Sequence, residues 1–535
     1  MKRAPSHPLV RLAAATVIAA CSAAPAVAQG TTPAVRKSTP YEDLQMFGQV
    51  LNQIRVNHPD SVDTHQLLMA AIEGMVSAAD PHSFVIPAVR LQPGKEEQLH
   101  SGKLVPVPVN FAFVDGAPLV ASVSAGSAAS HLDILPGDEL VSVSGTPTAA
   151  ASPEELDIDL AGPKGTEITL GFERRRIDGS LVVLERSVKR ERVGEATAIP
   201  AAMMLDSATG YVRVTTFMGD KVASDLHAAL DSLEKSGMLQ LVLDLRDNGG
   251  GSVSEAARVA GEFLPKGAIV YTSEGSKPEL TDTGRVSRSF WQSQQRKYPI
   301  VLLINAGTAS ASELVAGALQ DHDRALIMGR PSFGKSLLMR MFPLTDGSEI
   351  ELVVGRVRTP CGRIVQREYR NITRHEYWRL ARVDRDTAGR PACKTDAGRT
   401  VYGGGGIFPD VLVEAQPGAP LWYSRLSEEL LPITWAGGYA TAAGNSLGSL
   451  GAFVRAPALP QAAVSDFRDF AKKQGVVIPP DSASNAMLAQ LLTRAVANSK
   501  WGEAGLYSVA AVLDPEVAAA THDFVRAAML GRKSP

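Results

Sequence analysis

The sequence contains little cysteine, with three residues in a chain of 535. Cys21 lies near the start, so Cys361 and Cys393 are the pair that remains for the body of the protein. Neither belongs to a C-x-x-C pair or has a histidine at ligand spacing, so no metal site is expected. A disulfide between these two residues is favoured over two free thiols if the chain enters an oxidising compartment.

An excess of charge of either sign is also missing. The chain has 54 Lys and Arg against 56 Asp and Glu, a formal net charge of −2. The first 28 residues hold three basic and no acidic residues, so 51 − 56 leaves −5 for the rest. This balance argues against a partner that is nucleic acid. Beyond the N-terminus, no apolar run is long enough to span a bilayer.

The N-terminus has the layout of a secretory signal peptide, which we place at residues 1–28. Three basic residues accompany an apolar run, Leu12 to Ala20, and the small-residue site Ala26-Val27-Ala28 follows. We therefore expect an exported protein, periplasmic or otherwise extracytoplasmic. A second processing site, Ile18-Ala19-Ala20-Cys21, resembles a lipoprotein box and would leave Cys21 acylated as a membrane anchor. The sequence leaves the soluble and anchored forms open.

Hydrophobic periodicity divides the remaining chain into four regions. Residues 41–100 begin with two amphipathic helices, and residues 104–193 hold short β-rich runs broken by Gly, Pro and Asp turns. Residues 200–415 alternate strands with helices, which is typical of an α/β architecture with buried strands. Residues 417–535 carry mainly helical patterning, and we expect a separate C-terminal helical region there.

The β-rich region carries motifs that resemble a PDZ domain of the kind found in bacterial proteases. They are Gly126-Ser127-Ala128-Ala129, Leu135-Pro136-Gly137-Asp138-Glu139-Leu140, Val143-Ser144-Gly145 and Gly162-Pro163-Lys164-Gly165-Thr166. The loop that usually captures a peptide carboxylate reads Val105-Pro106-Val107-Pro108-Val109-Asn110 here. Proline has no backbone N–H to donate, so carboxylate capture is weakened or shifted. The alternative is a PDZ module that serves only as a spacer.

Two polar clusters follow predicted strands of the α/β region. Asp244-Leu245-Arg246-Asp247-Asn248 runs into three glycines, Gly249 to Gly251, whose amides can face a developing oxyanion. Gly307-Thr308-Ala309-Ser310-Ala311-Ser312-Glu313 opens a helix, where a serine hydroxyl meets favourable positive potential. Each cluster also has a simpler interpretation. The glycine turn is then only a tight connection, and Ser310 or Ser312 only caps the helix that follows.

The third cluster is Ser332-Phe333-Gly334-Lys335-Ser336. A lysine can act as general base for a serine only where burial or a cationic neighbour removes its proton, and a lysine after glycine is usually an exposed turn residue. The stretch Gly329 to Ser336 also satisfies the phosphate-loop pattern G-x-x-x-x-G-K-S. A strand-like run follows it in place of a helix, and Pro331 removes an amide, so nucleotide binding is disfavoured.

Together the clusters resemble the carboxyl-terminal processing (tail-specific) protease family of PDZ-containing serine peptidases. The resemblance runs from Tyr41 to Val413 and rests on several motifs in order: Asp80-Pro81-His82-Ser83, Asp244-Leu245-Arg246 with Gly250-Gly251, Thr308 to Glu313, Ser332 to Lys335, and Gly398 to Ile407 with Pro409-Asp410. It implies that Ser310 is the nucleophile and Lys335 its general base, with backbone amides of Gly250 and Ala311 as the oxyanion hole. It also implies a crotonase-like α/β peptidase core, with an inserted PDZ-type domain and N-terminal helices, and no cofactor.

Two positions depart from the family pattern. Many members have glutamine four positions after the lysine, where it helps to hold the amine, and Met339 stands there in this chain. A thioether is a poor hydrogen-bond acceptor, so Lys335 loses that support. Gly249 replaces the usual proline after the Asn of the glycine turn and makes the oxyanion loop more flexible.

The leading interpretation is an exported serine endopeptidase that cleaves unfolded polypeptides or polypeptides recognised by their C-termini. His322, between Asp321 and Asp323, suggests a Ser/His/Asp triad, but it lies about three helical turns beyond Ser310 and is not expected to reach the hydroxyl. The alternative function is a catalytically weak PDZ scaffold that binds envelope proteins. The oligomeric state is left open.

Overall fold

The computed structural model describes residues 39–531 except for these: 87–94, 96, 97, 99–102, 115, 116, 124–126, 136, 149–152, 176–180, 192–196, 288–294, 371, 373, 384 and 415–418. The predicted signal peptide and Cys21 lie outside the described residues. The chain forms two units, residues 1–71 and 72–535.

The first unit contains α1 (Pro40–Asn57) and the beginning of α2 (Thr64–Ala79). A capping box explains where α1 begins: the Thr39 side chain accepts from the Glu42 N–H, and the Glu42 carboxylate accepts from the Thr39 N–H. The apolar residues that predicted this helix, such as Leu44 and Phe47, are exposed in the structure.

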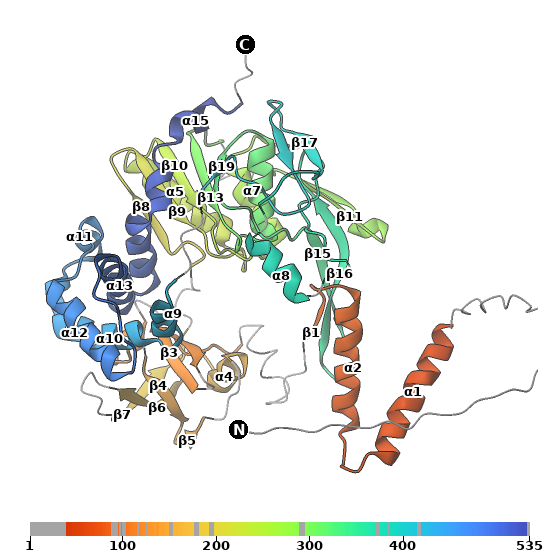
Figure 1. Cartoon of the computed structure of the whole chain (residues 1–535), viewed down its shortest axis with the longest axis horizontal. Coiled ribbons are helices and arrows are strands. Elements are labelled where there is room, and N and C mark those ends of the chain that lie inside the picture. Colours follow the sequence, from red (N-terminus) through yellow and green to blue (C-terminus); the bar gives the residue numbers. More distant parts are fainter. Residues whose placement is uncertain are drawn as a thin grey trace, which may run out of the picture. The chain divides into compact units, whose positions relative to one another are not determined.

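A six-stranded sheet forms the centre of the second unit (Figure 1), in the order β19-β14-β13-β10-β9-β8. Its strands are β8 (Ala201–Met204), β9 (Thr209–Arg213), β10 (Gln240–Asp244), β13 (Ile300–Ile304), β14 (Leu326–Gly329) and β19 (Val411–Leu412). The strands from β9 to β19 are parallel, and β8 is antiparallel to β9. The run Ile300–Ile304 is buried along its whole length, as expected for a parallel strand covered on both faces.

Helices cover both faces of this sheet. The apolar sides of α5 (Val222–Lys235), α6 (Val253–Gly261) and α7 (Ala311–Asp321) share one core with the sheet residues that face them. On the other face, the end of α13 (Ser482–Leu513) packs with α14 (Pro515–Ala520) and α15 (Phe524–Met529) on sheet residues such as Val242 and Leu303. The last helices of the chain thus cover the second face of the central sheet.

A second, antiparallel sheet has the order β1-β16-β11-β12, with β15 also paired to β16. Its strands are β1 (Phe84–Ile86), β11 (Ile269–Gly275), β12 (Asp282–Arg285), β15 (Leu337–Pro343) and β16 (Glu349–Arg358). The short helix η2 (Pro278–Leu280) joins β11 to β12, and α8 (Arg374–Val383) follows β16 in the chain. A separate hairpin joins β17 (Ala392–Lys394) to β18 (Thr400–Tyr402).

The β-rich region has a core of its own around Val120, Leu140 and Phe172. Its sheet has the order β2-β3-β4-β6-β7, with β5 paired to β4. The elements are β2 (Val109–Val114), β3 (Ala117–Val123), η1 (Ala128–His131), β4 (Glu139–Val143), β5 (Thr146–Pro147), α4 (Pro153–Leu160), β6 (Glu167–Arg175) and β7 (Leu181–Lys189). The loop with Pro106 and Pro108 leads into β2, with Val105 bridged to Gly162.

The C-terminal helices before α14 build another core, around Trp435, Phe467 and Leu492. They are α9 (Leu421–Glu428), α10 (Leu431–Ala443), η3 (Gly444–Leu447), α12 (Gln461–Lys473) and the first part of α13. The short helix α11 (Leu450–Arg455) belongs to a smaller core of Phe453, Ala497 and Val509. The described residues after 418 are mainly helical, and their buried side chains belong to three cores. Among the residues described, no helix is both long and apolar enough to cross a membrane.

Candidate active site

The three predicted clusters follow three neighbouring parallel strands. The glycine turn comes after β10, the Ser310 segment after β13 and the Lys335 segment after β14, and β13 pairs with both of the others. Because the carboxyl ends of parallel strands meet at one edge of a sheet, the fold brings these loops together there. A ligand crevice at this edge is common in open α/β sheets.

Ser310 has an unusual backbone conformation, with φ 56° and ψ −117°, directly before the first residue of α7. Such a geometry costs a residue with a side chain about 1–3 kcal/mol and persists only where neighbours enforce it. The neighbours are in the glycine turn: the Asn248 carbonyl accepts from the Ala309 N–H and from the Ser312 hydroxyl, each at 2.9 Å. The hydroxyl of Ser312 is thus occupied by Asn248.

Glu313 joins the Ser310 segment to the Lys335 segment. Its buried carboxylate accepts from the backbone N–H groups of Ser310 (2.9 Å), Gly334 (2.8 Å) and Lys335 (2.7 Å), and from the Ser332 hydroxyl. Burial raises the pKa of Glu313 to about 7, against the lowering effect of these donors. One side chain therefore sets the distance between the two segments.

Lys335 is half-buried and lines the same small cavity as Ser310. Most of the cavity wall is apolar, from Val253, Val270, Leu314, Leu337, Val357 and Val365. The backbone around Lys335 is held on both sides, because the Gln366 side chain accepts from the Ser336 N–H and the Gly334 carbonyl accepts from the Arg367 N–H. Within the described residues, no hydrogen bond or ion pair holds the Lys335 ammonium group.

The predicted oxyanion donors lie beside Ser310. Gly250 has φ 103°, and a Cβ on it would lie 2.9 Å from the Ser310 Cβ and 2.8 Å from the Ala309 carbonyl oxygen, so only glycine fits. Its N–H, however, donates to the Asn248 side-chain oxygen at 3.0 Å. The N–H of Ala311, at the first position of α7, meets no acceptor in the described part of the chain. Of the two predicted amides, that of Ala311 is the one available in this structure.

A network of buried ion pairs holds the start of the glycine turn. Asp244 is fully buried and accepts two bonds from the Arg246 guanidinium, at 3.0 and 2.7 Å. Burial opposes its ionisation, but the Arg246 charge prevails and lowers the pKa of Asp244 to about 2. Arg246 also pairs with Asp514 (2.7 Å) and Glu516 (2.9 Å), from the end of α13 and from α14.

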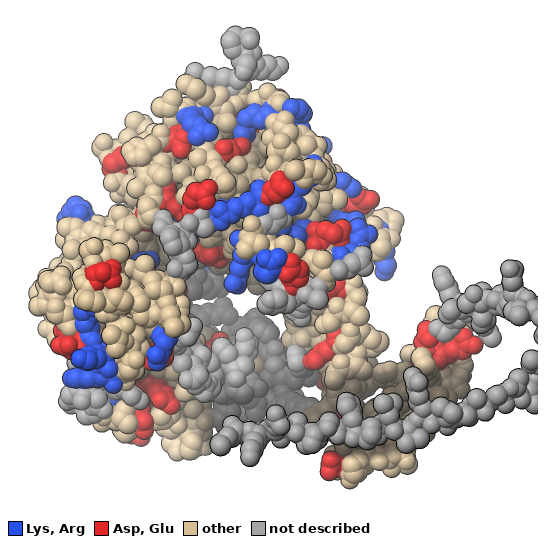
Figure 2. All heavy atoms as spheres, viewed as in Figure 1, with Lys and Arg blue, Asp and Glu red and all other residues tan. Residues whose placement is uncertain are grey.

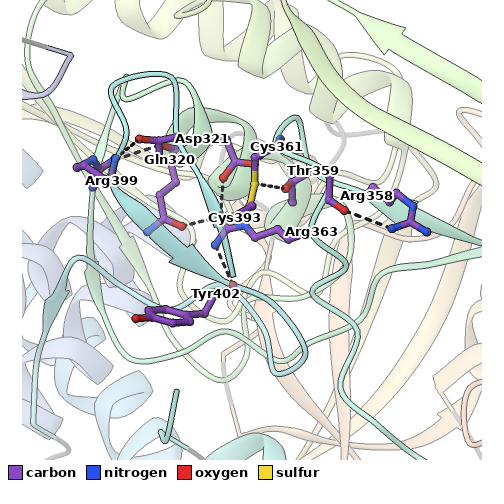
Figure 3. The surroundings of a disulfide bond; sticks show 11 residues. Gln320, Asp321, Arg358, Thr359, Cys361, Arg363, Cys393, Arg399 and Tyr402 are labelled. Carbon is purple, nitrogen blue, oxygen red and sulfur yellow. Dashed lines mark hydrogen bonds and ion pairs between the residues drawn. A yellow bond between two sulfur atoms is a disulfide. The ribbon is translucent and has the colours of Figure 1, made fainter. Parts of the chain in front are cut away.

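A disulfide joins Cys361, in the turn after β16, to Cys393 in β17 (Figure 3). Beside it, the buried Arg363 guanidinium pairs with Asp321 at 2.8 Å and donates to the Tyr402 carbonyl at 2.9 Å. The hairpin that carries Cys393 leads to Gly405 and Ile407, which lie against the Lys335 segment: the Ile407 N–H donates to the Ser332 hydroxyl, and Arg367 donates to the Gly405 carbonyl. The disulfide thus anchors the hairpin whose following residues contact the Lys335 segment.

Two other residues from the sequence analysis, His322 and Met339, do not line the cavity that Ser310 and Lys335 share. His322 ends α7, and its two ring nitrogens contact Asp396 (2.7 Å) and the Ile269 carbonyl (2.8 Å). Met339 lies in β15, opposite Val353. Within the residues described, no group of His, Cys, Asp and Glu has the arrangement of a metal site.

Sequence reasoning missed three structural contributors. Glu313 appears in the sequence only as the end of the Ser310 motif, and its Ser-x-x-Glu spacing predicts no more than a helix cap. His82 is buried, and its Nε2 lies 2.7 Å from the Tyr377 hydroxyl, which also contacts Gln366 at 3.0 Å. Glu516 lies 270 residues beyond Arg246, and nothing local signalled their contact.

Comparison with known proteins gives consistent results. The profile of Peptidase family S41 matches residues 208–375. A carboxy-terminal-processing protease of Bartonella bacilliformis is 31% identical over 345 residues, which cover 64% of this chain and 76% of the relative. A chloroplastic carboxyl-terminal-processing peptidase 2 of Arabidopsis thaliana is 33% identical over 319 residues, 56% of this chain and 59% of the plant protein.

Among solved structures, a photosystem II D1 C-terminal processing protease aligns with 68% of this chain and 86% of its own length, at 23% identity and a TM-score of 0.35. The identity to the Bartonella protein and its coverage establish the relationship by themselves. The chain belongs to the carboxy-terminal-processing proteases of Peptidase family S41.

Proposed function

We propose that this protease is a serine endopeptidase in which Ser310 is the nucleophile and Lys335 the general base. The Ser310 hydroxyl attacks the peptide carbonyl while the Lys335 amine takes its proton. Lys335 then gives that proton to the leaving amine, and a water activated by the same amine hydrolyses the acyl-enzyme. Ser310 and Lys335 line the same cavity, which supports this exchange of protons between them.

The observation that carries this proposal is the strained Ser310 backbone at the start of α7, beside that cavity. Strain of this kind clusters at functional sites because a fold retains it only where it is enforced. A serine that merely caps a helix has no need of φ 56°. Glu313 adds to the argument, since its carboxylate accepts four hydrogen bonds from the serine and lysine segments.

The oxyanion hole is built from backbone amides at the same place. The Ala311 N–H is the first donor, since it is unoccupied by any described residue and stands at a helix N-terminus. The Gly250 N–H becomes the second donor once it leaves the Asn248 side chain, to which it is bonded here. Each such donor contributes about 3 kcal/mol to transition-state binding.

We further propose a crotonase-like peptidase core with a PDZ-type insertion, exported and acting on unfolded polypeptides or polypeptides with exposed C-termini. The independent core of the β-rich region and its motifs support the PDZ assignment. The layout of residues 1–28 supports export and leaves a lipid anchor at Cys21 open. The buried Val107 and Val109 flank the second proline of the loop, which fits weakened carboxylate capture.

The decisive experiment is degradation of an unfolded model protein by the purified mature chain. Ser310→Ala and Lys335→Ala are expected to abolish cleavage, whereas Lys266→Ala, which removes an exposed lysine, leaves it unchanged. Full activity in either of the first two variants would refute the dyad.

The second candidate function is a scaffold that binds polypeptides without cutting them. It is motivated by Met339 and by the prolines at positions 106 and 108. An inert wild-type chain that nevertheless binds C-terminal peptides would favour this function.

A further inference from the structure

Lys335 lies between two cavities. The first, here called the Ser310 cavity, is lined by Ser310 and has mainly apolar walls. The second, here called the Arg382 cavity, has a volume of about 690 Å³ and is lined by residues from several elements, among them His82, Gly249, Ala309, Arg330 and Arg382. Lys335 lines both, so the two cavities flank the proposed catalytic base.

The proposed chemistry assigns a different part of the substrate to each cavity. The base that deprotonates the serine must later protonate the leaving amine, so the leaving peptide begins beside Lys335. The Ser310 cavity adjoins Ala311, the proposed oxyanion donor, so it lies on the acyl side, and its volume of about 30 Å³ leaves no room for a peptide segment. The Arg382 cavity is then left for the segment on the carboxyl side of the scissile bond. Its volume lies within the range of about 300–1,000 Å³ typical of ligand pockets.

The charged residues of the Arg382 cavity favour an anion. Besides Lys335 it has two arginines against one carboxylate, Asp247. Asp247 is already bonded to the Asn305 side chain at 2.8 Å, and Arg330 is paired with Glu516. Arg382 is exposed, and no described residue pairs with it. Figure 2 shows Lys and Arg side chains gathered around the position of α8, with acidic ones between them.

On the basis of the proposed endopeptidase activity, we propose that the Arg382 cavity binds the leaving segment of the substrate and that Arg382 selects a carboxylate there. A guanidinium binds carboxylates through two parallel hydrogen bonds, a geometry that a lysine cannot offer. The carboxylate comes either from the free C-terminus of a short tail or from an Asp or Glu side chain within it. Arg382 is thus a specificity residue for tails that carry negative charge near the cut.

The kinetic test uses peptides that share one acyl side and differ in the leaving segment: a free acid, its C-terminal amide, and an amide with one internal Glu. For wild type we expect KM to be about tenfold lower for the two charged segments than for the neutral amide, with similar kcat. Arg382→Ala should remove this preference, and Arg382→Lys should restore only part of it. Preference for the free acid alone identifies the C-terminus as the source, and preference for both identifies any carboxylate.

Arg379→Ala is the matched control. Arg379 lies on α8, is exposed and pairs with Glu376, and it does not line the cavity, so its loss changes the net charge equally without touching the site. Equal KM values for charged and neutral segments in wild type, or a preference that survives Arg382→Ala, would overturn the inference. Cleavage that persists in Ser310→Ala would instead overturn the proposed function.

A binding measurement keeps the inference testable if no peptide is cut. Fluorescent leaving-segment peptides, as acid and as amide, are titrated into the Ser310→Ala chain with and without Arg382→Ala. Tighter binding of the acid that depends on Arg382 supports the inference. Tighter binding that does not depend on it points to the β-rich region, and no difference between acid and amide also contradicts the inference.

Discussion

Glu313→Gln separates the structural role of this carboxylate from its charge. One carboxylate oxygen accepts from Ser332 and Gly334, and the other from Ser310 and Lys335. An amide replaces one of these oxygens by an NH₂ group, which then faces two donors. If the NH₂ group faces Ser310 and Lys335, two hydrogen bonds are lost. If it faces Ser332 and Gly334, the Ser332 hydroxyl can turn to accept from it, and the Gly334 bond is lost. In both cases one of the two segments loses support and shifts. A displacement of about 1 Å at such a site costs about 100-fold in rate.

The same variant has a measurable effect on stability versus pH. Burial raises the pKa of Glu313 from 4.5 to about 7, a difference of about 3 kcal/mol. The folded state holds the proton more tightly than the unfolded state, so ionising Glu313 destabilises the fold. This cost is absent below pH 4.5, where both states are protonated. It grows as the pH rises from 4.5 to 7 and is complete above 7.

The assay is urea unfolding of wild type and E313Q at pH values from 4.5 to 8.5. Relative to E313Q, the wild type should lose about 3 kcal/mol of unfolding free energy across that interval, most of it before pH 7. Glu279→Gln, which neutralises an exposed carboxylate, controls for net charge. A difference between wild type and E313Q that stays constant, or that grows in favour of wild type with pH, would refute the reasoning.

Three further changes test other parts of the site. Gly250→Ala should lower kcat/KM by 100-fold or more with an unchanged circular dichroism spectrum, because the new Cβ would collide with Ser310; normal turnover would contradict this. Glu516→Ala should lower the free energy of unfolding by roughly 2 kcal/mol, since it leaves Arg246 with fewer charged partners, and an unchanged urea midpoint would count against it. Cys393→Ser should cost roughly 4 kcal/mol by opening a 32-residue loop, and a reductant should then destabilise wild type but not the variant.

The sequence predicted the α/β class and the three loops because those signals are local. A buried run such as Ile300–Ile304 reads directly as a parallel strand, and a loop that follows such a strand must lie at its carboxyl end. The proximity of Ser310 and Lys335 therefore follows from strand order. Strand order does not predict that the Gly250 N–H donates to the Asn248 side chain, because a glycine turn allows this amide to bond either to Asn248 or to a ligand.

Local sequence patterns did not predict which parts of the protein the C-terminal helices contact. Helical periodicity shows that a helix has an apolar side and says nothing of what covers it. The pattern of residues 417–535 predicts a separate helical region, whereas Val517 of α14 and Phe524 of α15 pack on the central sheet.

Two buried glutamates tie the three loops together. Glu313 joins the loops after β13 and β14, through Ser310 and the backbone of Lys335. Glu516 joins the loops after β10 and β14, through Arg246 and Arg330. Strand pairing brings the loops to one edge but leaves each free to move at its tip, where the chemistry must take place. Because Glu516 comes from α14, the helical end of the chain contributes to the geometry of the site. Removal of this helical end should therefore impair catalysis as well as folding.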